Sequence, residues 1–172
     1  MNRLLIELMP VSLANAGGLA TLKHIRVSVQ EKDGKEIRRI LDIHGELKEL
    51  HDWLKEHRVD LLQNRIPVSE SKGSCIADVL CQFYNELNPD VDDPALMQSM
   101  YDYRVAHCLR FAFGGTDLSD IYLGTFNGVH EVSCWGKGEH WTYEIDLPRF
   151  LQDIERLCQE NNSEGANEAG SE

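Results

Sequence analysis

The period of the hydrophobic residues changes along this chain of 172 residues, and that change limits the fold most strongly. Near both ends, hydrophobic and polar residues alternate, as in strands with one buried face. In the middle and in the final segment they follow helical spacing. Strands and helices do not alternate with one another, so the pattern does not favour a doubly wound parallel sheet. The predicted fold class is α+β with antiparallel sheets.

The first third of the chain is predicted to form three strands. Ile25, Val27 and Val29 fall on one face of a strand, and the polar residues between them fall on the other. An Asp-Gly pair at Asp33 and Gly34 then predicts a tight turn. The predicted N-terminal strands cover residues 3–8, 22–30 and 36–43.

A central helical segment follows. Leu47, Leu50 and Leu54 have helical spacing with charged residues between them, which predicts a helix over residues 46–57 or longer. Ser74 is a candidate N-cap for a second helix that stops at the Asn-Pro pair of residues 88–89. Asp93 followed by a proline predicts a third, short helix over residues 94–102.

The C-terminal part is predicted to be a four-stranded meander and a final helix. Val105, Leu109 and Phe113 alternate with other residues, which indicates a strand. Asn127 and Gly128 form the strongest hairpin signal in the chain. The predicted strands cover residues 105–113, 119–126, 129–135 and 140–145, and the helix opens near residue 146.

The length fits a single α+β domain, which we place at residues 1–159. Residues 160–172 contain four Glu and no basic residue, and we expect a disordered acidic tail there. The first apolar run breaks at Glu7, and no stretch has the ~18 apolar residues that a membrane span needs. We therefore expect a cytoplasmic protein with no membrane partner. Five cysteines at irregular spacing do not indicate a disulfide framework.

The negative charge is concentrated in the later part of the chain. The formal net charge is −12, and residues 1–65 carry 11 Lys and Arg against 10 Asp and Glu. Residues 66–172 carry 6 against 19, a net of −13. Such a surface repels nucleic acid and anionic lipid and attracts basic proteins. The charge thus argues against nucleic acid as a partner, although it also serves solubility alone.

Histidines and cysteines of the predicted meander are the main candidates for chemistry. The set has no local ligand spacing of the kind zinc requires, so we predict no metal and no cofactor. These residues are the basis of the alternative function, a small cytosolic enzyme of unknown reaction, with hydrolysis as one candidate. Cys75, at the start of the second helix, lacks a local His or Asn partner. The residues in the set are His107, Cys108, His130, Cys134 and His140.

Residues 103–117, with the hairpin of residues 122–128, resemble segments of small bacterial immunity proteins. Residues 146–151, after a strand meander, are similar to the end of several such families. Immunity proteins protect bacteria against the toxins of contact-dependent growth inhibition and other polymorphic toxin systems. The resemblance implies a non-enzymatic protein that binds a cognate toxin, in many cases a nuclease with a basic groove, and blocks its active site. It leaves the oligomeric state open.

An acidic surface would suit such a groove, because it imitates phosphate and speeds association. The candidate partner-binding residues are acids in predicted loops and two tryptophans that would act as apolar anchors. They are Asp90, Asp92, Asp93, Asp117, Asp120, Glu139, Trp135 and Trp141.

Overall fold

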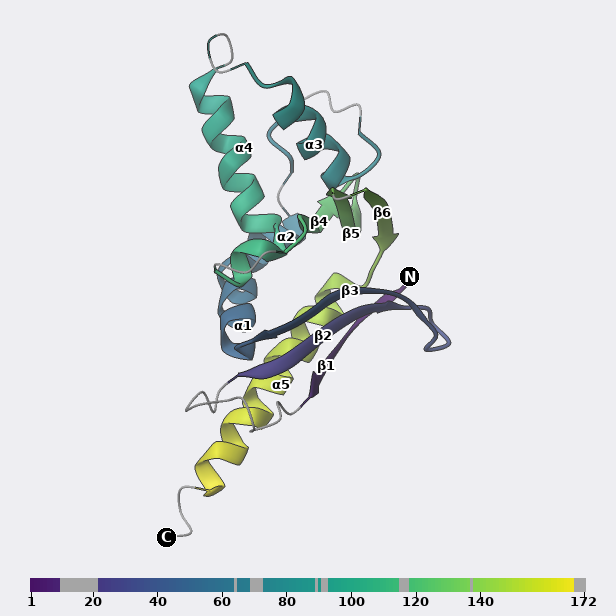
Figure 1. Cartoon of the computed structure of the whole chain (residues 1–172), viewed down its shortest axis with the longest axis vertical. Helices are drawn as coiled ribbons and strands as arrows, with labels where there is room; N and C mark the ends of the chain where they lie inside the picture. Colours follow the sequence, from purple (N-terminus) through teal and green to yellow (C-terminus); the bar gives the residue numbers. More distant parts are fainter. Residues whose placement is uncertain are drawn as a thin grey trace.

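The computed structural model contains two three-stranded antiparallel sheets and five α-helices among the residues that it describes. Those are residues 1–9, 22–63, 65–68, 73–88, 90, 93–114, 118–136 and 138–168, with side chains described up to residue 161. The molecule is elongated, with the N-terminal sheet toward one end and two helices at the other (Figure 1). The predicted α+β class is confirmed.

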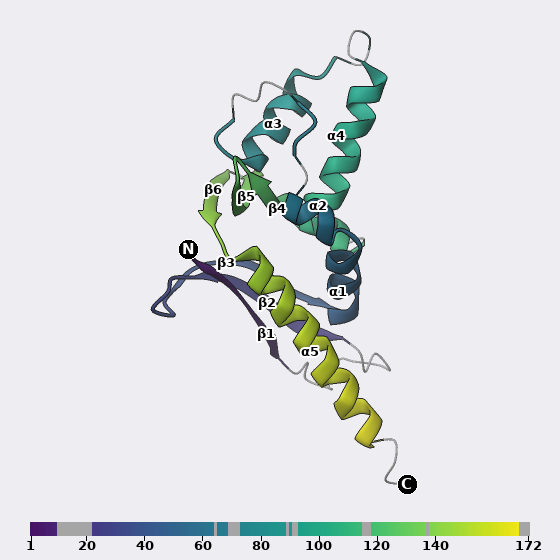
Figure 2. The same cartoon turned by 180° about the vertical axis from the view of Figure 1, so that it is seen from behind.

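The N-terminal sheet has the order β1–β2–β3. Its strands are β1 (Arg3–Met9), β2 (Lys23–Gln30) and β3 (Glu36–Gly45), and all neighbours are antiparallel. Gly34 in the predicted turn has φ +88°, which a residue without Cβ adopts freely. The long helix α5 (Leu147–Glu168) lies against this sheet and buries Phe150 and Ile154 there (Figure 2).

Two helices replace the single helix predicted after this sheet. They are α1 (Leu47–Glu56) and α2 (Arg58–Gln63), and the chain bends between them at His57. The leucines at helical spacing are buried as expected, with Leu50 and Leu61 fully excluded from solvent. They join the large core between the N-terminal sheet, α1 and α5.

The second sheet has the order β4–β5–β6, with β4 (Ile121–Phe126), β5 (Val129–Gly136) and β6 (Glu139–Glu144). Asn127 and Gly128 have φ +50° and +80°, so the predicted tight hairpin is confirmed. One face of this sheet adds Leu123 and Val132 to the large core. The other face contributes Tyr122 to a smaller core.

That smaller core lies under a pair of helices, α3 (Ile76–Glu86) and α4 (Pro94–His107). Ile76 and Leu80 of α3 meet Met100 and Tyr103 of α4 in it. The second sheet is therefore covered on both faces, by the large core on one side and by the α3–α4 pair on the other.

The strand predicted over residues 105–113 is wrong, and the second sheet has three strands where we expected a four-stranded meander. Helix α4 continues to His107, and a 3₁₀ helix, η2 (Leu109–Ala112), follows. Met100, Tyr103 and His107 are buried three and four residues apart, a helical pattern that overrides the alternation. Of the predicted strand, Cys108 forms an isolated bridge with Tyr122.

The end of the chain belongs to α5, whose backbone is helical to Glu168. The prediction of one domain over residues 1–159 and a disordered tail over 160–172 stays a prediction. None of the helices in the described part of the chain combines the length and the apolar character that crossing a membrane requires.

Candidate functional site

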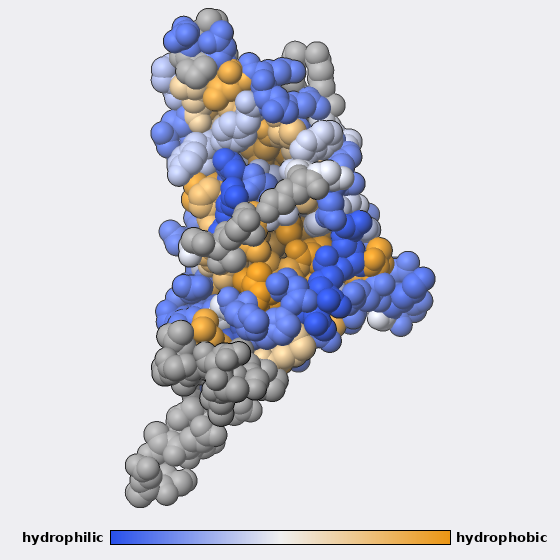
Figure 3. Space-filling model, viewed as in Figure 1, coloured by the Kyte–Doolittle hydropathy of each residue, from blue (hydrophilic) through white to orange (hydrophobic). Residues whose placement is uncertain are grey.

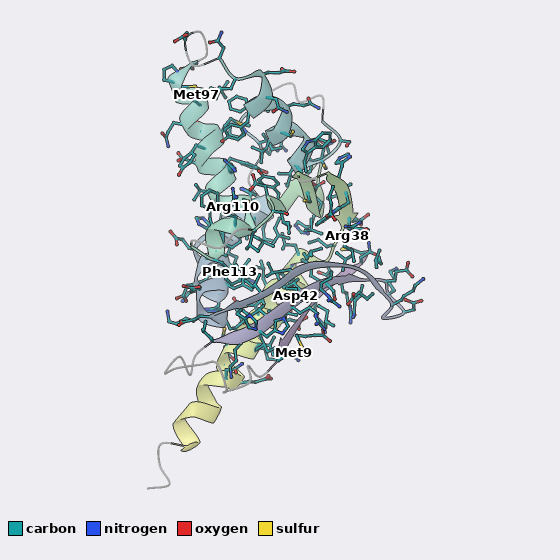
Figure 4. All side chains as sticks on the ribbon, in the orientation of Figure 1. Met9, Arg38, Asp42, Met97, Arg110 and Phe113 are labelled. Carbon is teal, nitrogen blue, oxygen red and sulfur yellow. The ribbon has the colours of Figure 1, made fainter. Side chains whose placement is uncertain are left out.

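Asp120, one of the predicted partner-binding acids, is held by two arginines of the protein itself. Nη2 of Arg104 lies 2.7 Å from its Oδ2, and Nη1 of Arg110 lies 3.1 Å from its Oδ1. Figure 4 shows Arg110 at the base of α4, near the junction with the sheets. Asp117 lies outside the described residues. The charge of Asp120 is thus compensated within the fold, which leaves little of it for a partner.

Glu139 and Trp141 are occupied in a similar way. Glu139 lies 3.3 Å from Nη1 of Arg38 and accepts a hydrogen bond of 3.1 Å from Nε1 of Trp141. The Arg38 guanidinium also lies 5.3 Å from the centre of the Trp141 ring, at cation–π distance. Figure 4 shows Arg38 on the side of β3 that lies nearest β6. These contacts join the two sheets.

Trp135, the other predicted anchor, lies on the surface. It is 44% exposed at the end of β5, and its ring centre is 4.4 Å from that of His140. Exposed indole rings are frequent anchors in protein interfaces. Trp135 therefore remains a candidate contact, separate from the acids discussed next.

The acids between α3 and α4 have a different environment. Asp90 is exposed, and Asp93 is the N-cap of α4, where its Oδ1 accepts a hydrogen bond of 2.9 Å from the amide of Ala95. Asp92 lies outside the described residues. The loop occupies one end of the molecule, beyond the helix pair (Figures 1 and 2). A partner can reach this end without contacting either sheet.

Further acids on the same two helices extend this surface, which we call the α3–α4 tip. Its described members are Glu86, Asp90, Asp93, Asp102 and the tyrosine Tyr101. All four carboxylates are exposed, and none forms an ion pair with a described residue. Residues 73–103 contain six Asp and Glu and no Lys or Arg. The charge of the tip is therefore not compensated within its own segment.

The tip also offers apolar area. Tyr101 is 49% exposed on α4, one residue before Asp102. Figure 4 shows Met97 at the outer end of the same helix. The face seen in Figure 3 has hydrophilic residues over this end, with a small hydrophobic patch among them. Acids around aromatic and aliphatic groups form a surface suited to a basic protein partner.

The single acidic surface expected from sequence is thus divided. Helix α3 has 11 residues and spans about 16 Å, and it separates the tip from the hairpin that carries Trp135 and Glu139. The sequence indicated Asp90 and Asp93 correctly as exposed loop acids. It missed Glu86, Asp102 and Tyr101. The signal that would have found them is the absence of Lys and Arg from residues 73–103.

The histidines and cysteines predicted to support an enzyme do not converge. His107 is buried, with its ring nitrogens 2.8 and 3.3 Å from backbone carbonyl oxygens, and burial lowers its pKa. Burial raises the pKa of Cys108 to about 12 and that of Cys134 to about 11. Of these five residues, only His140 lies in a described group of side chains that could bind a metal. The other two members of that group lie at the start of α3.

A groove of about 850 Å³ lies between the end of α2 and the β4–β5 hairpin. Arg65 is the one ionisable side chain among the described residues that line it. General acid–base catalysis needs a side chain whose pKa lies near the working pH, and an arginine stays protonated there. The described part of this groove does not provide one, so it does not support the enzyme alternative.

Comparisons with protein-family models, with curated proteins and with solved structures find no match to this chain. We therefore infer the function of this chain from the geometry of its described residues.

Proposed function

We propose that this protein binds and neutralises a basic protein partner, as immunity proteins do with toxin domains, and that the α3–α4 tip is its docking surface. The observation that carries the proposal is the set of four exposed carboxylates on this tip without an ion pair among the described residues. A nuclease toxin, whose groove is basic because it binds phosphates, fits this surface.

Uncompensated charge determines how fast such a partner arrives. Exposed carboxylates that are not paired internally attract positive charge over a Debye length, about 8–10 Å at physiological salt. Complementary charge of this kind raises association rates more than it lowers dissociation rates. Tyr101 adds an aromatic contact among these carboxylates. Aromatic side chains near the centre of an interface supply much of its binding energy. Asp120 and Glu139 have less part in this mechanism, since each is already paired with an arginine.

The test looks for a toxin gene directly upstream of this gene and measures binding to the domain that it encodes by surface plasmon resonance at several salt concentrations. The tip variant combines Glu86→Gln, Asp90→Asn, Asp93→Asn and Asp102→Asn. Asn is also a good N-cap, so α4 keeps its start. We expect the association rate at low salt to fall about tenfold or more, with a smaller dependence on salt.

The matched control removes the same number of charges elsewhere on the exposed surface, with Glu31→Gln, Glu49→Gln, Glu56→Gln and Glu144→Gln. We expect this control to lower the association rate at low salt by less than a third as much as the tip variant does. Equal losses in the two variants would show that net charge, and not the tip, drives binding. Failure of the neighbouring toxin domain to bind the wild-type protein would exclude it as the partner.

A further inference from the structure

Three side chains capable of binding a metal meet where α3 begins beside the second sheet. Cys75 is the N-cap of α3, Asp78 lies in its first turn, and His140 lies on β6. One ligand atom from each lies within 4.8 Å of the other two. Both ribbon views show the start of α3 next to β5 and β6 (Figures 1 and 2). The fold thus assembles sulfur, oxygen and nitrogen donors from distant parts of the sequence.

The Asp78 carboxylate is buried and held in a fixed position. The residue is 7% exposed. Its Oδ2 accepts hydrogen bonds from the amide of Ser74, at 3.0 Å, and from the Ser74 hydroxyl. Its Oδ1 is buried and lies 2.7 Å from Nε2 of His140, so the carboxylate and the imidazole form a close pair.

We propose that Cys75, Asp78 and His140 bind a zinc ion, with water at the fourth position. Thiolate, imidazole and carboxylate are the ligands that zinc prefers, at about 2.0–2.3 Å. A tetrahedral ion with such bonds places its ligands about 3.3–3.8 Å apart. The Asp78–His140 pair is closer than this and must open by about 1 Å. His140 is exposed on β6, directly after a turn, and can make that adjustment.

A metal fits these three residues better than a nucleophilic cysteine does. Cys75 has no solvent exposure, so a substrate does not reach its sulfur in this conformation. A nucleophilic cysteine needs an accessible thiolate. A bound zinc ion would hold the thiolate form of Cys75. The ion would also link the start of α3 to β6. This inference does not depend on the function of the α3–α4 tip.

The experiment uses the full-length protein, freed of metal with a chelator and titrated with Zn²⁺ against a chromophoric competitor. Co²⁺ substitution is the second readout, because cobalt bound to thiolate gives a charge-transfer band in the near ultraviolet. We expect one equivalent of zinc per chain. Cys75→Ser and His140→Ala should each weaken binding at least tenfold, and Cys75→Ser should abolish the charge-transfer band. His140 is exposed, so its variant tests the site even if replacing the buried cysteine impairs folding.

The matched controls are Cys81→Ser, on the same helix, and His130→Ala, on the strand paired with β6. Both should bind zinc as the wild type does. Absence of stoichiometric zinc binding in the wild type would overturn the inference. So would equal affinity in His140→Ala and the wild type, or a cobalt spectrum without the thiolate band. Alkylation of Cys75 at neutral pH in the metal-free protein, abolished in His140→Ala, would instead indicate a nucleophilic cysteine.

Discussion

At the scale of single residues, the first amides of α3 depend on side chains from a strand more than fifty residues away. The amide of Ile76 donates a hydrogen bond of 2.8 Å to Oε1 of Glu131, and that of Ala77 donates one of 3.2 Å to the Ser133 hydroxyl. A helix leaves its first amides without partners inside the helix. The cysteine side chain at the N-cap makes no capping hydrogen bond. The polar residues of β5 take its place.

The candidate zinc ligands show what the sequence could not provide at this scale. Cys75 was recognisable from sequence as a residue at a helix start that needed a partner. That partner, His140, is 65 positions further along the chain and arrives through the pairing of β6 with β5. The register of that pairing and the packing of α3 on the sheet decide the contact. Neither is encoded in a local pattern.

The pH dependence of stability should change when Glu131 is replaced by glutamine. Burial raises the pKa of Glu131 above its ordinary value of 4.5, so the folded state holds a proton that the unfolded state releases. The stability contributed by this carboxyl is therefore present at low pH and decreases as pH rises through the folded pKa. In Glu131→Gln, whose amide oxygen still accepts from Ile76, the urea midpoint should decrease less as pH rises above the ordinary carboxyl pKa of 4.5. Glu144→Gln, an exposed control, should behave as the wild type. A wild-type profile in Glu131→Gln would contradict the assignment.

At the scale of helices and strands, local signals predicted most of the fold. The Asp-Gly and Asn-Gly turns, the leucine spacing of α1 and the Asp-Pro start of α4 all match the structure. The failure was the segment after Met100. Its residues satisfy both an alternating and a helical pattern. Packing of Tyr103 against His107, four positions further along the sequence and with ring centres 3.7 Å apart, favours the helix.

Replacing the N-cap of α4 should separate its structural role from its charge. Asp93→Ala removes the hydrogen bond to the Ala95 amide and should lower the free energy of unfolding by about 1 kcal/mol. Asp93→Asn keeps an acceptor at the same place and should cost a few tenths at most. Asp90→Ala, an exposed neighbour that caps no helix, serves as the control. Urea denaturation measures all three. Equal losses in the alanine and asparagine variants of Asp93 would show that the cap does not stabilise α4.

At the scale of the whole molecule, the second sheet joins two hydrophobic cores. Leu123 points into the large core and its neighbour Tyr122 into the smaller one, as the alternation of a strand requires. The N-terminal segment reinforces the junction, because Asn2 exchanges backbone hydrogen bonds with Glu144 and Asp146 at the end of β6. The tip is therefore carried on a sheet that is itself part of the large core. This connection would give the proposed docking surface a rigid support.

If the shared sheet couples the two cores, damage to the small one should destabilise the whole molecule. Met100 has no solvent exposure and lies in the smaller core. Met100→Ala should lower the free energy of unfolding by about 2–5 kcal/mol. Native-state hydrogen exchange should then show equal losses of protection for slowly exchanging amides of α3 and of β2, because both are exposed in one cooperative opening. Leu50→Ala, in the large core, should give the same pattern. Loss of protection confined to α3 and α4 in Met100→Ala would mean that the helix pair opens independently, and that the sheet does not transmit stability between the cores.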